Sequence, residues 1–284
     1  MTDKILALVD GSAHARSVCL HSAWVAGRLG ASVELLHVLG RREGRAGGDL
    51  SGALQLGART ALLEQLAELD AQRAKLALAR GRAILDDAQA ILAEGGVTEV
   101  TPRLRQGDLI ETVAELEPTL RALVIGRRGE AAGFAEGHLG SNLERIIRSS
   151  RAPVFVAAAD YRPITRVLVA YDGGDSARTA IRRMAESPVF RGLAITIACA
   201  GADTPPVRAR LEEAQAQLAA AGLQAETAVA EGEPEVALKQ KIEAEGFDLL
   251  VMGAYGHSRI RSLIIGSTTT AMLQSARIPV LLYR

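Results

Sequence analysis

The sequence predicts an α/β protein made of two copies of one unit. Short apolar runs rich in β-branched residues alternate with segments of helical spacing along the 284-residue chain. Strands that are apolar on both faces and separated by helices are typical of a parallel sheet covered on both sides. The chain also repeats itself, so we expect two tandem five-stranded parallel α/β sandwiches.

The internal repeat is visible in three pairs of matching segments. The pairs are KILALVDGSAHAR (4–16) with TRVLVAYDGGDSAR (165–178), LVIGRRG (123–129) with LVMGAYG (250–256), and RAPVFV (151–156) with RIPVLL (277–282). The offset between partners falls from 162 to 127 and then to 126. The first copy therefore carries about 35 additional residues after its second strand, and one additional residue in its glycine loop.

The second copy shows its elements most clearly. Glycines at 222 and 246 close two of its helices, and a proline stands early in the first of them. We expect strands at 166–172, 194–200, 225–232, 247–254 and 278–284, and helices at 205–222, 233–246 and 267–276. The expected domains are residues 1–160, with a helical insertion at about 40–95, and residues 161–284.

The insertion in the first copy combines a loop at 40–57 with a helical run from about 58 to 94. Unbroken, this helix would be about 55 Å long at 1.5 Å per residue, which is longer than a small domain is wide. We expect it either to project from the domain or to bend near Gly81. Its charged residues indicate a solvated face, and it is a candidate surface for a homodimer.

Composition narrows the classes of function. Lys plus Arg equals Asp plus Glu at 33 each, so no long-range field attracts nucleic acid or an anionic membrane. No apolar run approaches the ~18 residues of a membrane span, and the start MTDKILALVDGS has too short an apolar run for a signal peptide. Cys19 and Cys199 lie singly in apolar runs, which predicts buried thiols and a cytoplasmic location.

A glycine pattern near the end of the chain points to a ligand. Gly253 and Gly256 follow an apolar strand, and nine residues later Gly266-Ser267-Thr268 opens a helix. Glycines let the backbone approach a bulky anion, and a helix start offers free N–H groups, hydroxyls and the positive end of the dipole. Two such cradles suit a chain of phosphates. Asp172, after the first strand of this copy, could accept from ribose hydroxyls or hold a metal that bridges the phosphates.

These residues closely resemble the universal stress proteins in their tandem two-domain form. Members of that family that bind ATP have an Asp after the first strand and a Gly-x2-Gly-x9-Gly-Ser/Thr signature after the fourth. The second copy matches this pattern from end to end. The resemblance implies a Rossmann-like sheet of order 3-2-1-4-5, ATP with Mg as a candidate companion ion, and adenine held by the second strand near Val38 in one copy and Ala200 in the other.

The first copy matches the same pattern less well, because its spacer has ten residues and its loop gains Arg127 and Arg128. Either arginine could contact phosphates or fill the pocket. The second copy should therefore bind nucleotide more tightly. The corresponding site residues of the first copy are Asp10, Gly126, Gly129, Gly140, Ser141 and Asn142.

Other interpretations of these motifs remain open. Asp10 and Asp172 could simply cap the helices that follow them. A scaffold of the same fold that binds no nucleotide, or a slow ATPase, also fits the sequence, although no catalytic residue can be assigned. YDGGDSA resembles the loop of the ATP pyrophosphatases, but Asp172 replaces its first Ser and the spacing is one residue short. No glycine fingerprint or cysteine pair supports a redox role.

The histidines carry little functional signal. His14, His21 and His37 are expected to be surface or core residues, and His138 and His257 lie within the two loops where they could touch ligand.

The last strand of each copy predicts how the copies assemble. PVFVAA (153–158) and PVLLYR (279–284) would lie at sheet edges, and exposed edges invite pairing. In single-domain relatives this strand typically joins two subunits. We therefore expect an internal pseudo-dimer in which these two strands meet. The partners expected in addition are an adenine nucleotide and an unidentified protein.

Overall fold

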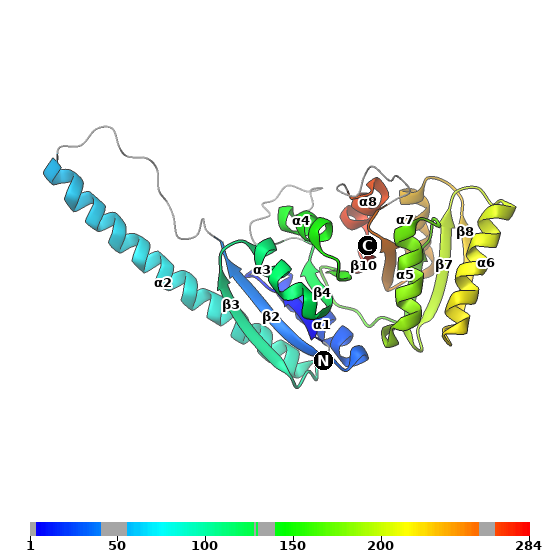
Figure 1. Ribbon diagram of the computed structural model, residues 1–284, viewed down its shortest axis with the longest axis horizontal. Coiled ribbons are helices and arrows are strands. Elements are labelled where there is room, and N and C mark those ends of the chain that lie inside the picture. Colours follow the sequence, from blue (N-terminus) through cyan, green and yellow to red (C-terminus); the bar gives the residue numbers. More distant parts are fainter. Residues whose placement is uncertain (1–3, 41–55, 128, 130–139, 256–264) are drawn as a thin grey trace.

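The structure, a computed structural model, describes residues 4–40, 56–127, 129, 140–255 and 265–284 (Figure 1). The first copy contains β1 (Lys4–Leu8), α1 (Ala15–Leu29), β2 (Ser32–Leu39), α2 (Leu56–Glu94), β3 (Val100–Gln106), α3 (Leu109–Leu116), the 3-10 helix η1 (Glu117–Thr119), β4 (Leu120–Gly126), α4 (Ser141–Ser149) and β5 (Val154–Ala157). The second contains β6 (Arg166–Ala170), α5 (Asp175–Glu186), η2 (Pro188–Phe190), β7 (Ala194–Ala200), α6 (Pro205–Ala220), β8 (Ala225–Ala230), α7 (Pro234–Glu245), β9 (Leu249–Gly253), α8 (Ser267–Ser275) and β10 (Val280–Tyr283).

All ten strands form one sheet in the order β3-β2-β1-β4-β5-β10-β9-β6-β7-β8. Within each copy the neighbouring strands are parallel and follow the order 3-2-1-4-5 that the family resemblance implied. The predicted α/β class and strand order are therefore confirmed. The strand bounds differ from the predicted ones by at most three residues, because strand pairing ends before the apolar runs do.

The two copies meet through their last strands. β5 and β10 pair antiparallel, with Leu281 opposite Phe155 and Val280 opposite Val156. This pairing satisfies backbone groups that each five-stranded sheet would otherwise leave at an exposed edge. The sequence-based expectation that these strands meet is confirmed.

Helices cover both faces of the sheet, and each face has its own core. The core on one face takes side chains from α1, α2, α5 and α6, and the core on the other face takes them from α3, α4, α7 and α8. Alternate strand residues feed the two cores, such as Ile5 and Leu6 of β1. Each core includes residues of both copies, so packing continues across the seam between β5 and β10.

The helical run of the insertion forms the single helix α2, which starts two residues before the predicted position and extends well beyond the sheet (Figure 1). Residues 41–55, most of the expected loop at 40–57, lie outside the described part of the chain. Of the two expected outcomes, projection is the one observed. Gly81 does not mark a bend. A Cβ there would lie 2.8 Å from Leu104 Cδ1 and 3.1 Å from His37 Cδ2. Gly81 thus allows α2 to approach β2 and β3 closely at the point where the helix reaches the sheet.

Candidate functional site

The strand ends of the second copy bring three predicted site residues to one edge of the sheet. β6 lies between β7 and β9, with Ala170 opposite both Ala198 and Met252. Asp172 follows β6, Ala200 ends β7 and Gly253 ends β9. In an open parallel sheet, the crevice outside these carboxyl ends is where ligands bind.

The loop after β6 holds Asp172 in a fixed turn. Asp172 Oδ1 accepts a hydrogen bond from the backbone N–H of Gly174 at 2.8 Å, while the side chain remains exposed. Gly173 has φ of +79°, a conformation that favours glycine. Gly174 is the N-cap of α5 and makes no side-chain cap. The carboxylate therefore shapes the turn that leads into α5 by accepting from the N-cap residue of that helix.

The start of α8 lies beside the end of β9. The N–H of Gly266 donates to Ala254 O at 3.2 Å, and Thr269 Oγ1 donates to Gly253 O at 3.1 Å. Gly266 is the N-cap, and the first N–H groups after it have no acceptor within the helix. Ser267 is exposed and Thr268 is half-buried at this end. Thr269, which the sequence did not single out, is the residue that ties the helix start to the strand.

Gly253 has a packing role that the sequence did not predict. A Cβ on this residue would lie 2.9 Å from Ser176 Cβ and 3.0 Å from Ala177 N, and closer still to Ser176 Oγ. The missing side chain therefore faces the first turn of α5 and not the space above the strand ends. Ser176 Oγ also donates to Tyr255 O, which fixes the loop against α5. Gly253 is required for packing between β9 and α5.

Arg210 of α6 is a charged neighbour of the site that sequence reasoning missed. Its Nη1 donates to Asp172 O at 2.9 Å, and a Cβ on Gly173 would lie 3.1 Å from the same nitrogen. Burial raises the pKa of the Cys199 thiol, while nearby Arg210 opposes this rise and Asp172 adds to it. The guanidinium thus brings positive charge to the edge where Asp172 lies. No sequence spacing could have indicated it, because 38 residues separate Arg210 from Asp172.

The first copy repeats this arrangement in part. Asp10 Oδ1 accepts from Ser12 N at 3.1 Å, which matches the turn at Asp172. A Cβ on Gly129 would lie 2.8 Å from Asp10 Oδ2, so the structure brings these two predicted residues together. The other predicted residues lie at the same ends of their elements: Val38 near the end of β2, Gly126 at the end of β4, Gly140 at the N-cap of α4, and Ser141 and Asn142, both exposed, in its first turn.

Arg127 belongs to the first copy, but its guanidinium bonds to the second copy. Its Nη2 donates to Ile278 O at 3.1 Å and its Nη1 donates to Ala276 O, the residue that ends α8. These two bonds are a role that the sequence did not predict, beside the expected phosphate contact or filling of the pocket, which stay predictions. Arg127 instead connects the first glycine loop to the second copy.

The second glycine loop makes the reverse connection. Tyr255 Oη donates to Ile147 O at 3.4 Å, and Arg284 Nη1 donates to Arg148 O at 3.0 Å. Both acceptors lie in the last turn of α4. Arg284 also lies over the Tyr255 ring, 5.4 Å from its centroid. Each glycine loop is therefore linked to the C-terminal end of the helix whose start belongs to the other site.

Several predicted residues lie outside the described part of the chain. They are Gly256, Arg128, His138 and His257. His21 and His37 are buried, and the Nδ1–H of His37 donates to Val9 O at 2.8 Å, so they are core residues. His14 is half-buried at the N-cap of α1.

The site offers few protein ligands for a metal ion. Within the described ranges, no three His, Cys, Asp or Glu side chains gather as a metal site would require. Mg²⁺ is commonly bound through one or two carboxylates together with phosphate oxygens and water. The exposed carboxylate of Asp172 fits such an arrangement.

Within the described part of the chain, no helix has the length and apolar content needed to cross a membrane.

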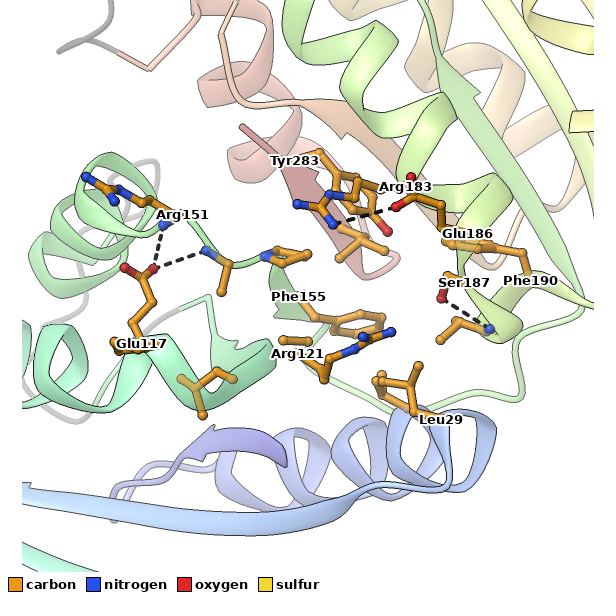
Figure 2. A pocket seen from close by; sticks show the side chains of 18 residues that line it. Leu29, Glu117, Arg121, Arg151, Phe155, Arg183, Glu186, Ser187, Phe190 and Tyr283 are labelled. Atoms are coloured by element: carbon orange, nitrogen blue, oxygen red, sulfur yellow. Dashed lines mark hydrogen bonds and ion pairs between the residues drawn. The ribbon is translucent and has the colours of Figure 1, made fainter. Parts of the chain in front are cut away.

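A separate cavity of about 410 Å³ lies at the seam between the copies (Figure 2). Leu29 of α1, Phe155 of β5 and Tyr283 of β10 line it, and none of the predicted nucleotide residues does. Its charged groups already have partners: Glu117 Oε1 accepts from the N–H groups of Arg151 and Ala152, and Arg183 pairs with Glu186 at 3.6 Å. Figure 2 shows the Arg151 guanidinium directed away from the cavity. We attribute this space to packing between the copies.

Comparisons with known proteins identify the family. The family model described as "Universal stress protein family" matches residues 1–158 and 200–284. Universal stress protein Slr1230 of Synechocystis sp. is 37% identical over 284 residues, covering 99% of each chain, and Universal stress protein Rv1996 of Mycobacterium tuberculosis is 22% identical over 237 residues, covering 73% of this chain and 74% of its own. The crystal structure of a universal stress protein from Archaeoglobus fulgidus superposes with a TM-score of 0.72 at 19% identity, covering 100% of this chain and 99% of that one. The chain belongs to the universal stress protein family, in a tandem form.

Proposed function

We propose that this protein is an ATP-binding stress-response regulator whose tighter site is in the second copy. The observation that carries the proposal is the convergence of an exposed carboxylate, Asp172, with the free helix start at Gly266 and Ser267 on one edge of the sheet. Ala200 at the end of β7 offers backbone groups for the adenine, and Arg210 adds a cation beside the loop. Mg²⁺ would bind between Asp172 and the phosphates.

In this proposal the bound nucleotide biases the conformation or the partner binding of the protein and does not fuel turnover. No general base, nucleophile or arginine finger can be assigned among the predicted site residues, so we expect hydrolysis to be slow at most. The proposed location is the cytoplasm, because both cysteines are free and buried as expected under reducing conditions. We retain residues 1–160 and 161–284 as the proposed domains.

Titration calorimetry with ATP tests the proposal and its asymmetry. Asp172→Ala should weaken binding more than Asp10→Ala, since the second copy has the full spacing. Asp160→Ala is the matched control, because this exposed residue lies in the linker between β5 and β6. Equal losses at the two sites, or a larger loss for Asp10→Ala, would assign the tighter site to the first copy. Adenine nucleotide released by heating the purified protein would provide independent support.

The helix start gives the sharpest test. Gly266→Val adds a branched side chain where phosphates would rest, so it should nearly abolish ATP binding, whereas Ser267→Ala should cost about 0.5–1.5 kcal/mol, or up to ~3 if its partner is charged. ATP should raise the melting temperature of the wild type and leave that of Gly266→Val unchanged. A folded Gly266→Val protein with wild-type affinity would favour the second candidate, a nucleotide-independent scaffold, for which the projecting helix α2 provides a surface.

A further inference from the structure

The projecting part of α2 is a long helix with no buried residue. Between residues 62 and 80 every side chain is exposed or half-buried, and burial begins only at Gly81 and continues at Leu85, Ala88 and Leu92. This segment is about 28 Å long at 1.5 Å per residue. Figure 1 shows it extending away from the sheet. The helix therefore has two parts, and only the second belongs to the core.

The projecting part carries more apolar surface than a solvated helix needs. Three of the four large apolar side chains exposed in the described part of the chain lie here, namely Leu63 (55% exposed), Leu69 (49%) and Leu76 (70%). Leu62, Leu66, Leu69 and Leu76 are separated by four, three and seven residues, which is the spacing of a coiled-coil seam. On this seam Leu69 and Leu76 are exposed and Leu62 and Leu66 are half-buried, and an apolar stripe of this kind marks an interaction surface.

The charges on this segment indicate what covers the stripe. Residues 62–71 carry three acidic side chains (Glu64, Glu68 and Asp70) and no basic one, and residues 72–82 carry four basic side chains (Arg73, Lys75, Arg80 and Arg82) and no acidic one. A second copy laid antiparallel would place its basic stretch beside the acidic stretch of the first. A parallel copy would align like charges.

The seam positions give the same orientation. Continuing the stripe by threes and fours from Leu69 reaches Arg73, then Leu76 and Arg80. A parallel pair in register would therefore set Arg73 against Arg73. An antiparallel pair centred near residue 71 sets Leu66 of one chain against Leu76 of the other. It also sets Arg73 of one chain against Leu69 of the other, where the acidic stretch of that second chain lies alongside. A polar residue at a seam position commonly specifies orientation in this way.

We propose that the projecting part of α2 pairs antiparallel with the same segment of a second copy of this chain, forming a two-helix dimer interface. The pairing needs no bound nucleotide, so it is independent of the proposed ATP site. Because the interface is a single pair of helices, it is smaller than a standard stable interface of about 800 Å² per partner, and we expect a concentration-dependent dimer.

Sedimentation velocity of the full-length protein over a range of concentrations tests the pairing. We expect the wild type to shift from 29.9 kDa toward twice that mass as concentration rises. Leu69→Glu combined with Leu76→Glu should weaken the dimer at least tenfold. Val236→Glu is the matched control, because Val236 is equally exposed (51%) but lies on α7, and its dimer should be unchanged. Circular dichroism and a thermal melt should show that both variants fold.

Two further measurements test the orientation. Mixing chains that carry Leu66→Cys with chains that carry Leu76→Cys should give a disulfide between the two kinds of chain under mild oxidation, since the natural cysteines are buried. Either variant alone should crosslink poorly. Arg73 also pairs with Asp70 of its own chain at 3.7 Å, so the charge test uses two kinds of chain. Arg73→Glu should weaken the dimer, and mixing these chains with chains that carry Asp70→Arg should restore pairing between the two kinds.

The outcomes that overturn the proposal are distinct. A wild type that stays at 29.9 kDa over the whole concentration range excludes self-pairing and leaves the stripe to another protein. A dimer that survives Leu69→Glu with Leu76→Glu uses a different surface. Efficient crosslinking of Leu66→Cys with itself shows a parallel pair and refutes the stated orientation.

Discussion

Replacing Gly253 by alanine should destabilise the protein strongly for so small a change. The added Cβ would lie 2.9 Å from Ser176 Cβ and 3.0 Å from Ala177 N, separations that packed side chains do not tolerate. Overpacking of this kind costs about 1–3 kcal/mol. If Ser176 moves to make room, its hydrogen bond to Tyr255 O is lost as well, at about 0.5–1.5 kcal/mol. We therefore expect a total loss of about 2–4 kcal/mol.

Chemical denaturation measures this loss, and two further variants establish its cause. Gly27→Ala is the control, because a Cβ on Gly27, inside helix α1, would meet nothing within 4 Å. It should be neutral or stabilise by up to ~1 kcal/mol. Ser176→Gly removes both nearby side-chain atoms, so combining it with Gly253→Ala should cost at least ~1 kcal/mol less than the sum of the single changes.

Two results would refute the packing argument. Wild-type stability for Gly253→Ala would mean that β9 and α5 separate without cost. Additive losses for Gly253→Ala and Ser176→Gly would mean that the new Cβ does not meet Ser176.

Three other predictions concern ionisable groups. Burial lowers the pKa of His21 to about 4, so the unfolded state binds a proton at a higher pH than the folded state does. The free energy of unfolding should therefore fall by on the order of 3 kcal/mol as the pH drops from 6.5 toward 4. His21→Gln should remove most of that pH dependence in denaturation curves. Burial, opposed by Arg16, raises the pKa of Cys19 to about 12, so a thiol reagent at pH 8 should modify it only after unfolding, and rapid reaction of the native protein would contradict its buried position. Partial burial raises the pKa of Glu117, but hydrogen bonds from Ser150 Oγ and two backbone N–H groups outweigh burial and lower the pKa overall. Glu117→Gln should therefore cost about 1–3 kcal/mol of stability at pH 7. The difference in stability between wild type and variant should shrink as the pH falls through the lowered pKa.

The repeat and the alternating pattern were enough to predict the α/β class and the duplication, because both can be seen in the chain itself, whereas the strand order came from the family resemblance. Apolar runs between helical segments predict a buried parallel sheet wherever they occur. The apolar edge strands predicted the pairing of β5 with β10, because an unpaired edge is unfavourable in any surroundings.

The roles of particular glycines and arginines could not be predicted, because they depend on neighbours distant in sequence. A bend near Gly81 is one of two outcomes that the sequence allows for α2, and the structure shows that Gly81 permits contact with Leu104 of β3 instead. Gly253 was assigned to anion binding, and its missing side chain faces Ser176. For Arg127 the sequence predicts phosphate contact or filling of the pocket, and it gives no sign of the bonds to carbonyls about 150 residues further along the chain. A motif indicates where backbone freedom is needed but not which neighbour requires it.

The crossed links between the two glycine loops have a thermodynamic consequence. Arg127 bonds to the end of α8, whose start is the second candidate site, and Tyr255 bonds to the end of α4, whose start is the first. If a ligand at either helix start tilts that helix, the hydrogen bonds at its other end would pass the shift to Arg127 or Tyr255 of the opposite copy. Coupling of this kind is reciprocal: the factor by which occupancy of one site changes the affinity of the other is the same in both directions. Positive coupling of this kind would make a tandem chain respond to a ligand of both sites more steeply than two separate domains would.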